Sequence, residues 1–115
     1  MKTILTFSFL FLALGACTVM ELAESPEAAA DVMLIAEGRS VAVAHCSACH
    51  ALDGTAESPN SAAPPMTQLL ARYDADSLAN DLIEGIRVGH DEMPEFSFPV
   101  TAADALVAYL KSVRE

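Results

Sequence analysis

The chain of 115 residues contains no tryptophan, and aromatic side chains make up only 6% of it. Basic residues are also few: six Lys and Arg stand against 16 Asp and Glu, which gives a formal net charge of -10. This charge disfavours binding to nucleic acid or to an anionic bilayer, and it favours a partner protein with a basic docking surface. With so few aromatics, we expect a core of Leu, Ala and Val with a gap that a bound group would fill.

The sequence also lacks any sustained alternation of apolar and polar residues, so no β-strand is predicted and we expect a single all-α domain. Helices are expected at residues 32–45, after Asp31 as N-cap, at 66–73, and from Asp74 or Asp76 to Gly89. A last helix is expected after Thr101, which with Asp104 resembles a capping box. Its apolar stripe consists of Ala102, Ala105, Leu106, Tyr109, Leu110 and Val113.

The longest apolar run, from Ile4 to Leu14, is too short to span a bilayer, which takes about twenty residues. With Lys2 before it and small residues after it, residues 1–16 are predicted to be an export signal. Leu14-Gly15-Ala16-Cys17 resembles the bacterial lipoprotein box, in which the cysteine is lipid-modified; plain cleavage and an uncut anchor are the alternatives. We therefore expect a periplasmic or outer-face protein, lipid-anchored at Cys17, with a tether at 17–31 and a domain at 32–115.

The other two cysteines lie in the pentapeptide Cys46-Ser47-Ala48-Cys49-His50, the residue set that covalent haem attachment requires. Cysteines three positions apart lie about one helical turn from each other, so both can reach one porphyrin edge while His50 ligates the iron. A redox-active dithiol is an alternative, but that motif sits at a strand-to-helix junction. A zinc site that includes His45 is another, although adjacent ligands converge poorly on one tetrahedral ion. The motif together with an export signal predicts one haem c.

From the first expected helix to the last, the chain resembles the class I c-type cytochromes, which are small folds of three to four helices around one covalently bound haem. Residues 89–96, GHDEMPEF, are similar to the methionine loop of that family, which implies Met93 as the second axial ligand. A soft, neutral thioether raises the reduction potential of haem iron, and Pro94 stiffens the loop. Met66 and His90 compete for this role, but Met66 belongs to an apolar helix stripe and His90 has no proline beside it.

The same resemblance implies further contacts with the haem. In the segment from Ala63 to Met66, Pro64 corresponds to the carbonyl that accepts the N–H of the proximal histidine, and Met66 to an apolar contact with the ring. Gly38 and Tyr109 resemble the pair at which the first and last helices cross. Three arginines are either solvated surface residues or partners of the haem propionates: Arg39, Arg72 and Arg87.

If protein side chains fill both axial positions, the iron has no vacancy for a substrate, and outer-sphere electron transfer is the chemistry that remains. The sequence therefore predicts an electron carrier rather than an enzyme, which passes single electrons between a donor and an acceptor protein outside the cytoplasm. It acts either freely or as the haem subunit of a complex. Two other functions stay open: a haem-based gas or redox sensor with a displaceable distal ligand, and a structural lipoprotein with an incidental motif.

Overall fold

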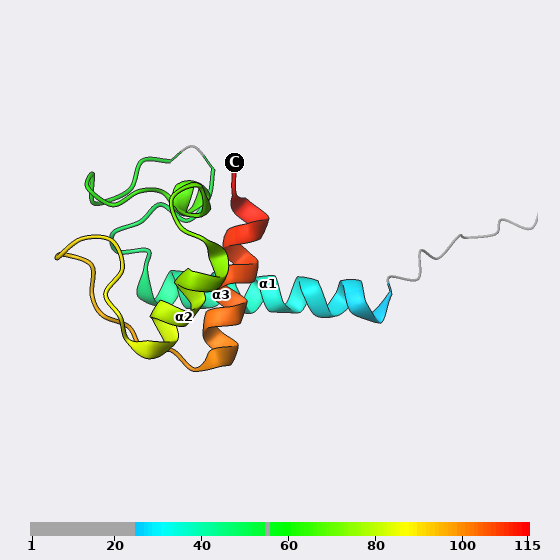
Figure 1. The fold of residues 1–115 in the computed structure, drawn as a ribbon. Coiled ribbons are helices and arrows are strands. Elements are labelled where there is room, and N and C mark those ends of the chain that lie inside the picture. Colours follow the sequence, from blue (N-terminus) through cyan, green and yellow to red (C-terminus); the bar gives the residue numbers. More distant parts are fainter. Residues whose placement is uncertain (1–24, 55) are drawn as a thin grey trace, which may run out of the picture.

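The computed structural model describes residues 25–54 and 56–115. Along the chain it contains helix α1 (Pro26–His45), the 3₁₀ helix η1 (Met66–Ala71), α2 (Ala75–Glu84) and α3 (Val100–Val113). No β-strand occurs in these two ranges, and the expected all-α fold is confirmed. In Figure 1, α3 runs across α1, and the N-terminal turns of α1 project beyond the rest of the domain. None of the helices in this part of the chain has both the length and the hydropathy needed to cross a bilayer.

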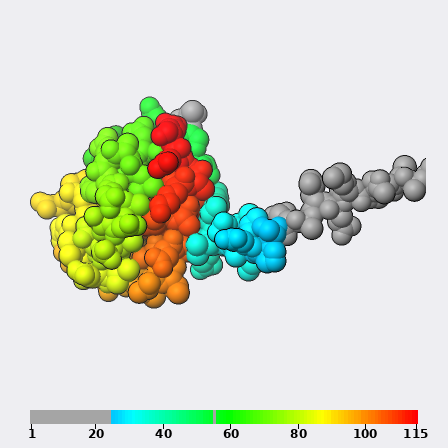
Figure 2. Space-filling model, turned by 45° about the vertical axis from the view of Figure 1, so that its right-hand side comes forward, coloured from blue at the N-terminus to red at the C-terminus, as the bar shows by residue number. Residues whose placement is uncertain are grey.

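Helix α1 begins at Pro26, so the prediction of Asp31 as its N-cap is wrong. Ser25 is the N-cap, and its Oγ accepts a hydrogen bond from the Ala28 N–H at 3.2 Å. Pro26 occupies the first turn, where a missing N–H costs nothing, and the alanines after it are strong helix formers. Residues 26–31 of the predicted tether are therefore helical, and Figure 2 shows these turns standing clear of the body of the domain. The predicted signal, Cys17 and the start of the tether lie outside the described residues.

The crossing of α1 and α3 depends on the buried Gly38. A Cβ at this position would overlap the backbone carbonyl of Ala105 in α3 and would lie 2.9 Å from the Cβ of Tyr109. Only a residue without a side chain permits so close an approach of two helix backbones. The predicted meeting of Gly38 and Tyr109 is thus confirmed.

Helix α3 supplies much of the core, and most of its predicted apolar stripe is buried: Ala105, Leu106, Tyr109 and Leu110. It begins at Val100, directly after Pro99, and no side chain caps its first turn. The predicted capping box of Thr101 and Asp104 is wrong, because the helix starts before Thr101 and places both residues inside it.

Helix α2 is shorter than predicted. Asp74, one of the two expected N-caps, accepts the Ser77 N–H through its Oδ1 at 3.0 Å. The helix ends at Glu84 and not near Gly89, because Gly85 adopts a left-handed conformation with a φ of +77°. Ile86, which the predicted span to Gly89 placed inside the helix, falls beyond it and is 48% exposed.

The segment expected to be a helix at residues 66–73 forms a 3₁₀ helix that ends at Ala71. Its first residue, Met66, donates its N–H to the carbonyl oxygen of Ala51 at 2.9 Å. This bond ties η1 to the residue that follows the pentapeptide, and so places η1 beside it.

Candidate functional site

The pentapeptide lies at the C-terminal end of α1, where Cys46 is the C-cap residue. The carbonyl oxygen of Cys46 accepts the N–H of Cys49 at 3.1 Å and that of His50 at 2.9 Å, so the chain continues in tight turns. Cys46 and Cys49 are both free thiols. Cys46 and His50 are buried, whereas Cys49 is partly exposed. The local backbone thus presents two thiols and one imidazole from a single compact segment.

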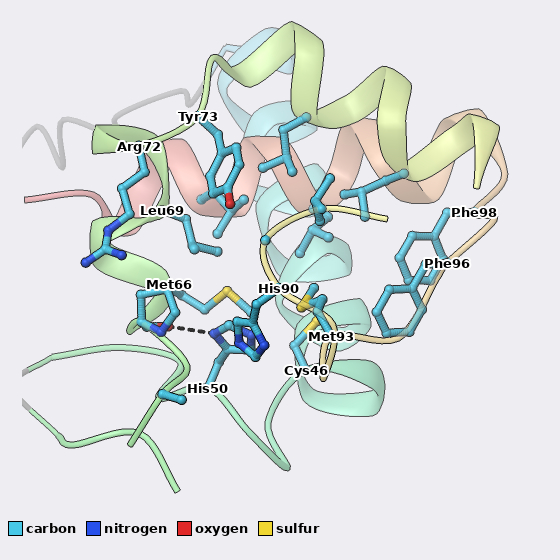
Figure 3. A pocket seen from close by; sticks show the side chains of 18 residues that line it. Cys46, His50, Met66, Leu69, Arg72, Tyr73, His90, Met93, Phe96 and Phe98 are labelled. Atoms are coloured by element: carbon cyan, nitrogen blue, oxygen red, sulfur yellow. Dashed lines mark hydrogen bonds between the residues drawn. The ribbon is translucent and has the colours of Figure 1, made fainter. Parts of the chain in front are cut away.

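An apolar cavity of about 280 Å³ lies beside this segment (Figure 3). Most of its walls are apolar side chains from η1, α2, α3 and the loop between α2 and α3: Met66, Leu69, Leu78, Leu82, Val88, Met93, Phe96, Phe98, Leu106 and Leu110. A second cavity of about 130 Å³ shares five wall residues with the first and also touches Cys49 and Pro94. The predicted site residues of the domain therefore surround two adjoining cavities: Cys46, Cys49, His50, Pro64, Met66 and Met93.

The imidazole of His50 is oriented by one hydrogen bond. Its Nδ1 lies 2.6 Å from the carbonyl oxygen of Pro64, as the dashed line in Figure 3 marks. A carbonyl oxygen only accepts hydrogen bonds, so Nδ1 carries a proton, and in the neutral imidazole Nε2 is then the nitrogen with the free lone pair. A neutral imidazole in this tautomer is a good ligand for a transition metal, and the bond to Pro64 fixes its ring orientation.

Two candidate ligands from the same loop line both cavities. Met93 and His90 form one turn, in which the Met93 N–H donates to the His90 carbonyl oxygen at 2.9 Å. The His90 Nδ1 accepts the N–H of Glu92 at 3.3 Å, which leaves its Nε2 free. Met66 is 2% exposed and lines only the larger cavity. His50 and Met93 thus reach a common cavity from two segments far apart in the sequence.

Residues 34–110 match the family model described as cytochrome c oxidase, cbb3-type, subunit III. The chain belongs to the class I c-type cytochromes. The match extends from α1 into the last turns of α3 and includes the pentapeptide and the segment of Met93. Comparison with curated proteins and with solved structures found no match. Membership of this family makes the protein a haem c-binding electron carrier, whose covalent haem is attached through the CxxCH motif at Cys46, Cys49 and His50.

The walls of the larger cavity fit the haem of this cytochrome. Burial raises the pKa of the Cys46 thiol to about 11, and charge repulsion from Cys49 adds to the rise. The thiol is therefore uncharged at neutral pH, and its conversion to an equally neutral thioether removes no charge from the buried site. Apolar walls, two free thiols and an imidazole with an open Nε2 together supply what a covalently bound porphyrin needs.

The zinc alternative finds no ligand set among the described residues. In residues 25–54 and 56–115, no three His, Cys, Asp or Glu side chains are grouped so that they could hold a metal ion. His45 instead faces two phenylalanine rings.

The three arginines differ in their surroundings. Arg39 forms an ion pair with Asp53 at 3.4 Å, and Arg87 forms one with Glu95 at 3.0 Å. Arg72 lines the larger cavity, and no acidic side chain of the described ranges lies within 4.0 Å of it. Figure 3 shows its guanidinium at the rim of the cavity, beyond Leu69. Arg72 is therefore the arginine best placed to pair with a haem propionate.

Sequence reasoning missed an aromatic cluster, formed by His45, Phe96 and Phe98. The His45 ring lies 5.2 Å from that of Phe98 and 6.1 Å from that of Phe96, edge-on in both cases, and the two phenylalanine rings are stacked at 5.1 Å. The only signal in the sequence was the presence of two aromatics two positions apart in a chain that has few. The cluster joins the last residue of α1 to the segment that leads from Met93 to α3.

Proposed function

We propose that this cytochrome carries single electrons between two redox proteins outside the cytoplasm, and that His50 and Met93 are the axial ligands of its haem iron. The observation that supports this proposal is that both side chains line the same cavity, one from the turn after α1 and one from the loop before α3. With both positions filled, the iron has no open site for a substrate. The haem, when bound, supplies a one-electron couple between ferric and ferrous iron.

The side chains of the protein set the properties of that couple. The Pro64 carbonyl holds His50 in one tautomer and increases the basicity of its Nε2. The Met93 thioether is a soft and neutral donor that favours ferrous iron, and so raises the reduction potential. Apolar walls such as Leu82 and Leu106 keep water away from the site. An environment with few mobile dipoles reorganises little when an electron arrives or leaves, which favours fast transfer.

The ligand assignment is tested by replacing Met93 with Ala and recording the oxidised spectrum. We expect this variant to lose the far-red absorption band that arises from the sulfur–iron bond, whereas Met66→Leu and His90→Ala keep it. Carbon monoxide should leave the spectrum of the reduced wild type unchanged. A band that persists in Met93→Ala contradicts the ligand assignment, and a ready shift with carbon monoxide favours the sensor function instead.

We further propose a redox partner with a basic docking surface. The net charge of -10 supports this, and Glu92 and the partly exposed Cys49 both line the second cavity. Association of oppositely charged surfaces slows with added salt. The rate of electron transfer to the partner that copurifies from native membranes should therefore fall as ionic strength rises. A rate that is independent of salt contradicts the basic surface. The description of the matched family makes an oxidase a reasonable candidate acceptor.

The proposed location is the outer face of a membrane, with a lipid on Cys17. The apolar run of residues 4–14 and the box that ends at Cys17 support export and lipid modification. Metabolic labelling with a fatty acid should mark the wild type, whereas Cys17→Ser should remain unlabelled. Labelling of both chains, or of neither, contradicts the anchor.

A further inference from the structure

We propose that His45 is a positioning residue: through the aromatic cluster it holds the α2–α3 loop, residues 86–99, which contains Met93, against the end of α1. In this way it sets the separation between the two chain segments that carry the axial ligands. The inference extends the proposed function, because it takes Met93 as the distal ligand.

The position of His45 in the chain makes this role possible. His45 is the last residue of α1 and directly precedes Cys46, so its position is fixed relative to the pentapeptide. Phe96 and Phe98 follow Met93 closely, so their positions limit where Met93 can lie. A contact between these side chains therefore links the segment of the proximal ligand to the segment of the distal ligand.

The geometry of the cluster is that of favourable aromatic pairs. His45 meets the rings of Phe98 and Phe96 at interplanar angles of 67° and 73°, and the centroid separations lie within the range at which edge-to-face pairs attract each other. Phe96 and Phe98 are stacked with an interplanar angle of 7°. Figure 3 shows the two phenylalanine rings side by side at one edge of the cavity. His45 thus contacts a stacked pair of rings.

The hydrogen bonds and ion pairs of the α2–α3 loop do not reach α1. The Phe98 N–H donates to the Leu82 carbonyl oxygen at 2.9 Å, and the Ser97 Oγ donates to that of Ile83 at 3.3 Å; both acceptors lie in α2. Within the loop, Arg87 donates to Glu95 through Nε and Nη2, at 3.2 and 3.0 Å. Among the described residues, every hydrogen bond and ion pair of the loop thus joins it to α2, to the start of α3 or to itself. Attachment to α1 rests on apolar and aromatic contacts, of which the cluster with His45 is one.

Weakening this contact should raise the fraction of molecules in which the loop moves away and Met93 leaves the iron. An added ligand such as imidazole binds ferric haem only in that open state, so its apparent affinity rises in proportion to the open fraction. Aromatic pairs of this kind shift an equilibrium by about twofold to tenfold. Imidazole binding therefore measures the effect of His45 on the loop directly.

The experiment compares the haem-loaded wild type with His45→Ala, His45→Phe and Val43→Ala, by titrating each oxidised protein with imidazole at one fixed pH. Val43 lies in the same helix, is 45% exposed and takes no part in the cluster, so Val43→Ala is the matched control. We expect His45→Ala to bind imidazole about twofold to tenfold more tightly than the wild type. His45→Phe, which restores an aromatic edge, and Val43→Ala should both bind as the wild type does.

The outcomes separate this inference from the proposed function. If the oxidised wild type lacks the far-red sulfur–iron band, the Met93 assignment fails and this inference fails with it. If the band is present but His45→Ala binds imidazole no better than the wild type, only the role of His45 is overturned. That role is likewise overturned if His45→Phe binds as tightly as His45→Ala, or if Val43→Ala does. If His45→Ala fails to load haem, Phe96→Leu removes the same contact from the loop side. An imidazole affinity of Phe96→Leu equal to that of the wild type would overturn the inference.

Discussion

The hydroxyl group of Tyr109 in α3 donates a hydrogen bond to the carbonyl oxygen of Leu52, which lies two residues after His50. Tyr109 is only 2% exposed, and burial, followed by the nearby Asp53 carboxylate, raises its pKa. The hydroxyl therefore remains a donor throughout the neutral range. One side chain thus packs in the crossing of the two long helices and also fixes the chain just beyond the proximal ligand.

We expect Tyr109→Phe to destabilise the haem-loaded protein by about 1–2 kcal/mol, because the ring still fills its place but the Leu52 carbonyl loses its partner. Urea unfolding, followed by far-ultraviolet circular dichroism, measures the difference. Thr101→Val is the control, since Thr101 lies at an exposed position of α3 and its hydroxyl makes no hydrogen bond to another described residue. Equal stability of Tyr109→Phe and the wild type would show that the bond contributes nothing.

Gly38→Ala should destabilise the protein by about 2–3 kcal/mol, although alanine is the better helix former by about 1 kcal/mol. The reason is that the new Cβ meets the backbone carbonyl of Ala105, which cannot move aside as a flexible side chain would. Thermal unfolding measures the change. Ala36→Gly, at an exposed position of the same helix, should cost only the propensity difference. A Gly38→Ala protein more stable than the wild type would contradict the close approach of α1 and α3.

The N-cap of α2 should make stability depend on pH in the acid range. Hydrogen bonds from the backbone N–H and the side chain of Ser77 hold the pKa of the Asp74 carboxyl below its usual range. Its folded pKa is lower than its unfolded pKa, so its contribution is present above the unfolded value and is lost as pH falls through the folded one. Asp74→Asn keeps a capping oxygen but cannot titrate. Melting temperatures of the two proteins should therefore converge on acidification, and a constant gap between them would contradict this role of Asp74.

Arg72→Gln should lower the reduction potential of the haem. Ferric haem carries one positive charge more than ferrous haem, so a nearby guanidinium favours the ferrous form, and its removal favours the ferric form. Potentiometric titration measures the shift. Arg72→Lys should lower the potential less than Arg72→Gln does. Arg114→Gln, at an exposed position near the C-terminus, should leave the potential unchanged. An unchanged potential in Arg72→Gln would show that the Arg72 guanidinium does not lie close to the haem.

The sequence predicted best what depends on local spacing. The pentapeptide has a fixed local spacing and the stripe of α3 has a helical period, so each depends only on residues of its own segment. Helix ends were predicted poorly at Asp31 and Gly89, because several residues compete to cap or end a helix. Ser25 caps α1 because Pro26 follows it in the first turn. Gly85 ends α2 because it adopts a left-handed backbone conformation. The contact of His45 with Phe96 and Phe98 escaped prediction because it joins segments some fifty residues apart, which only tertiary packing brings together.

The projecting start of α1 has a mechanical consequence for any attachment of the chain ahead of Ser25. A helix rises about 1.5 Å per residue, so the nine exposed residues from Pro26 to Leu34, which come before the core contact of Ile35, make a stalk of about 14 Å that bends little. A flexible linker of equal length would let the redox centre take up many different distances from its anchoring point. Under the proposed anchoring, the helical stretch instead contributes a fixed length to the distance between the redox centre and the membrane.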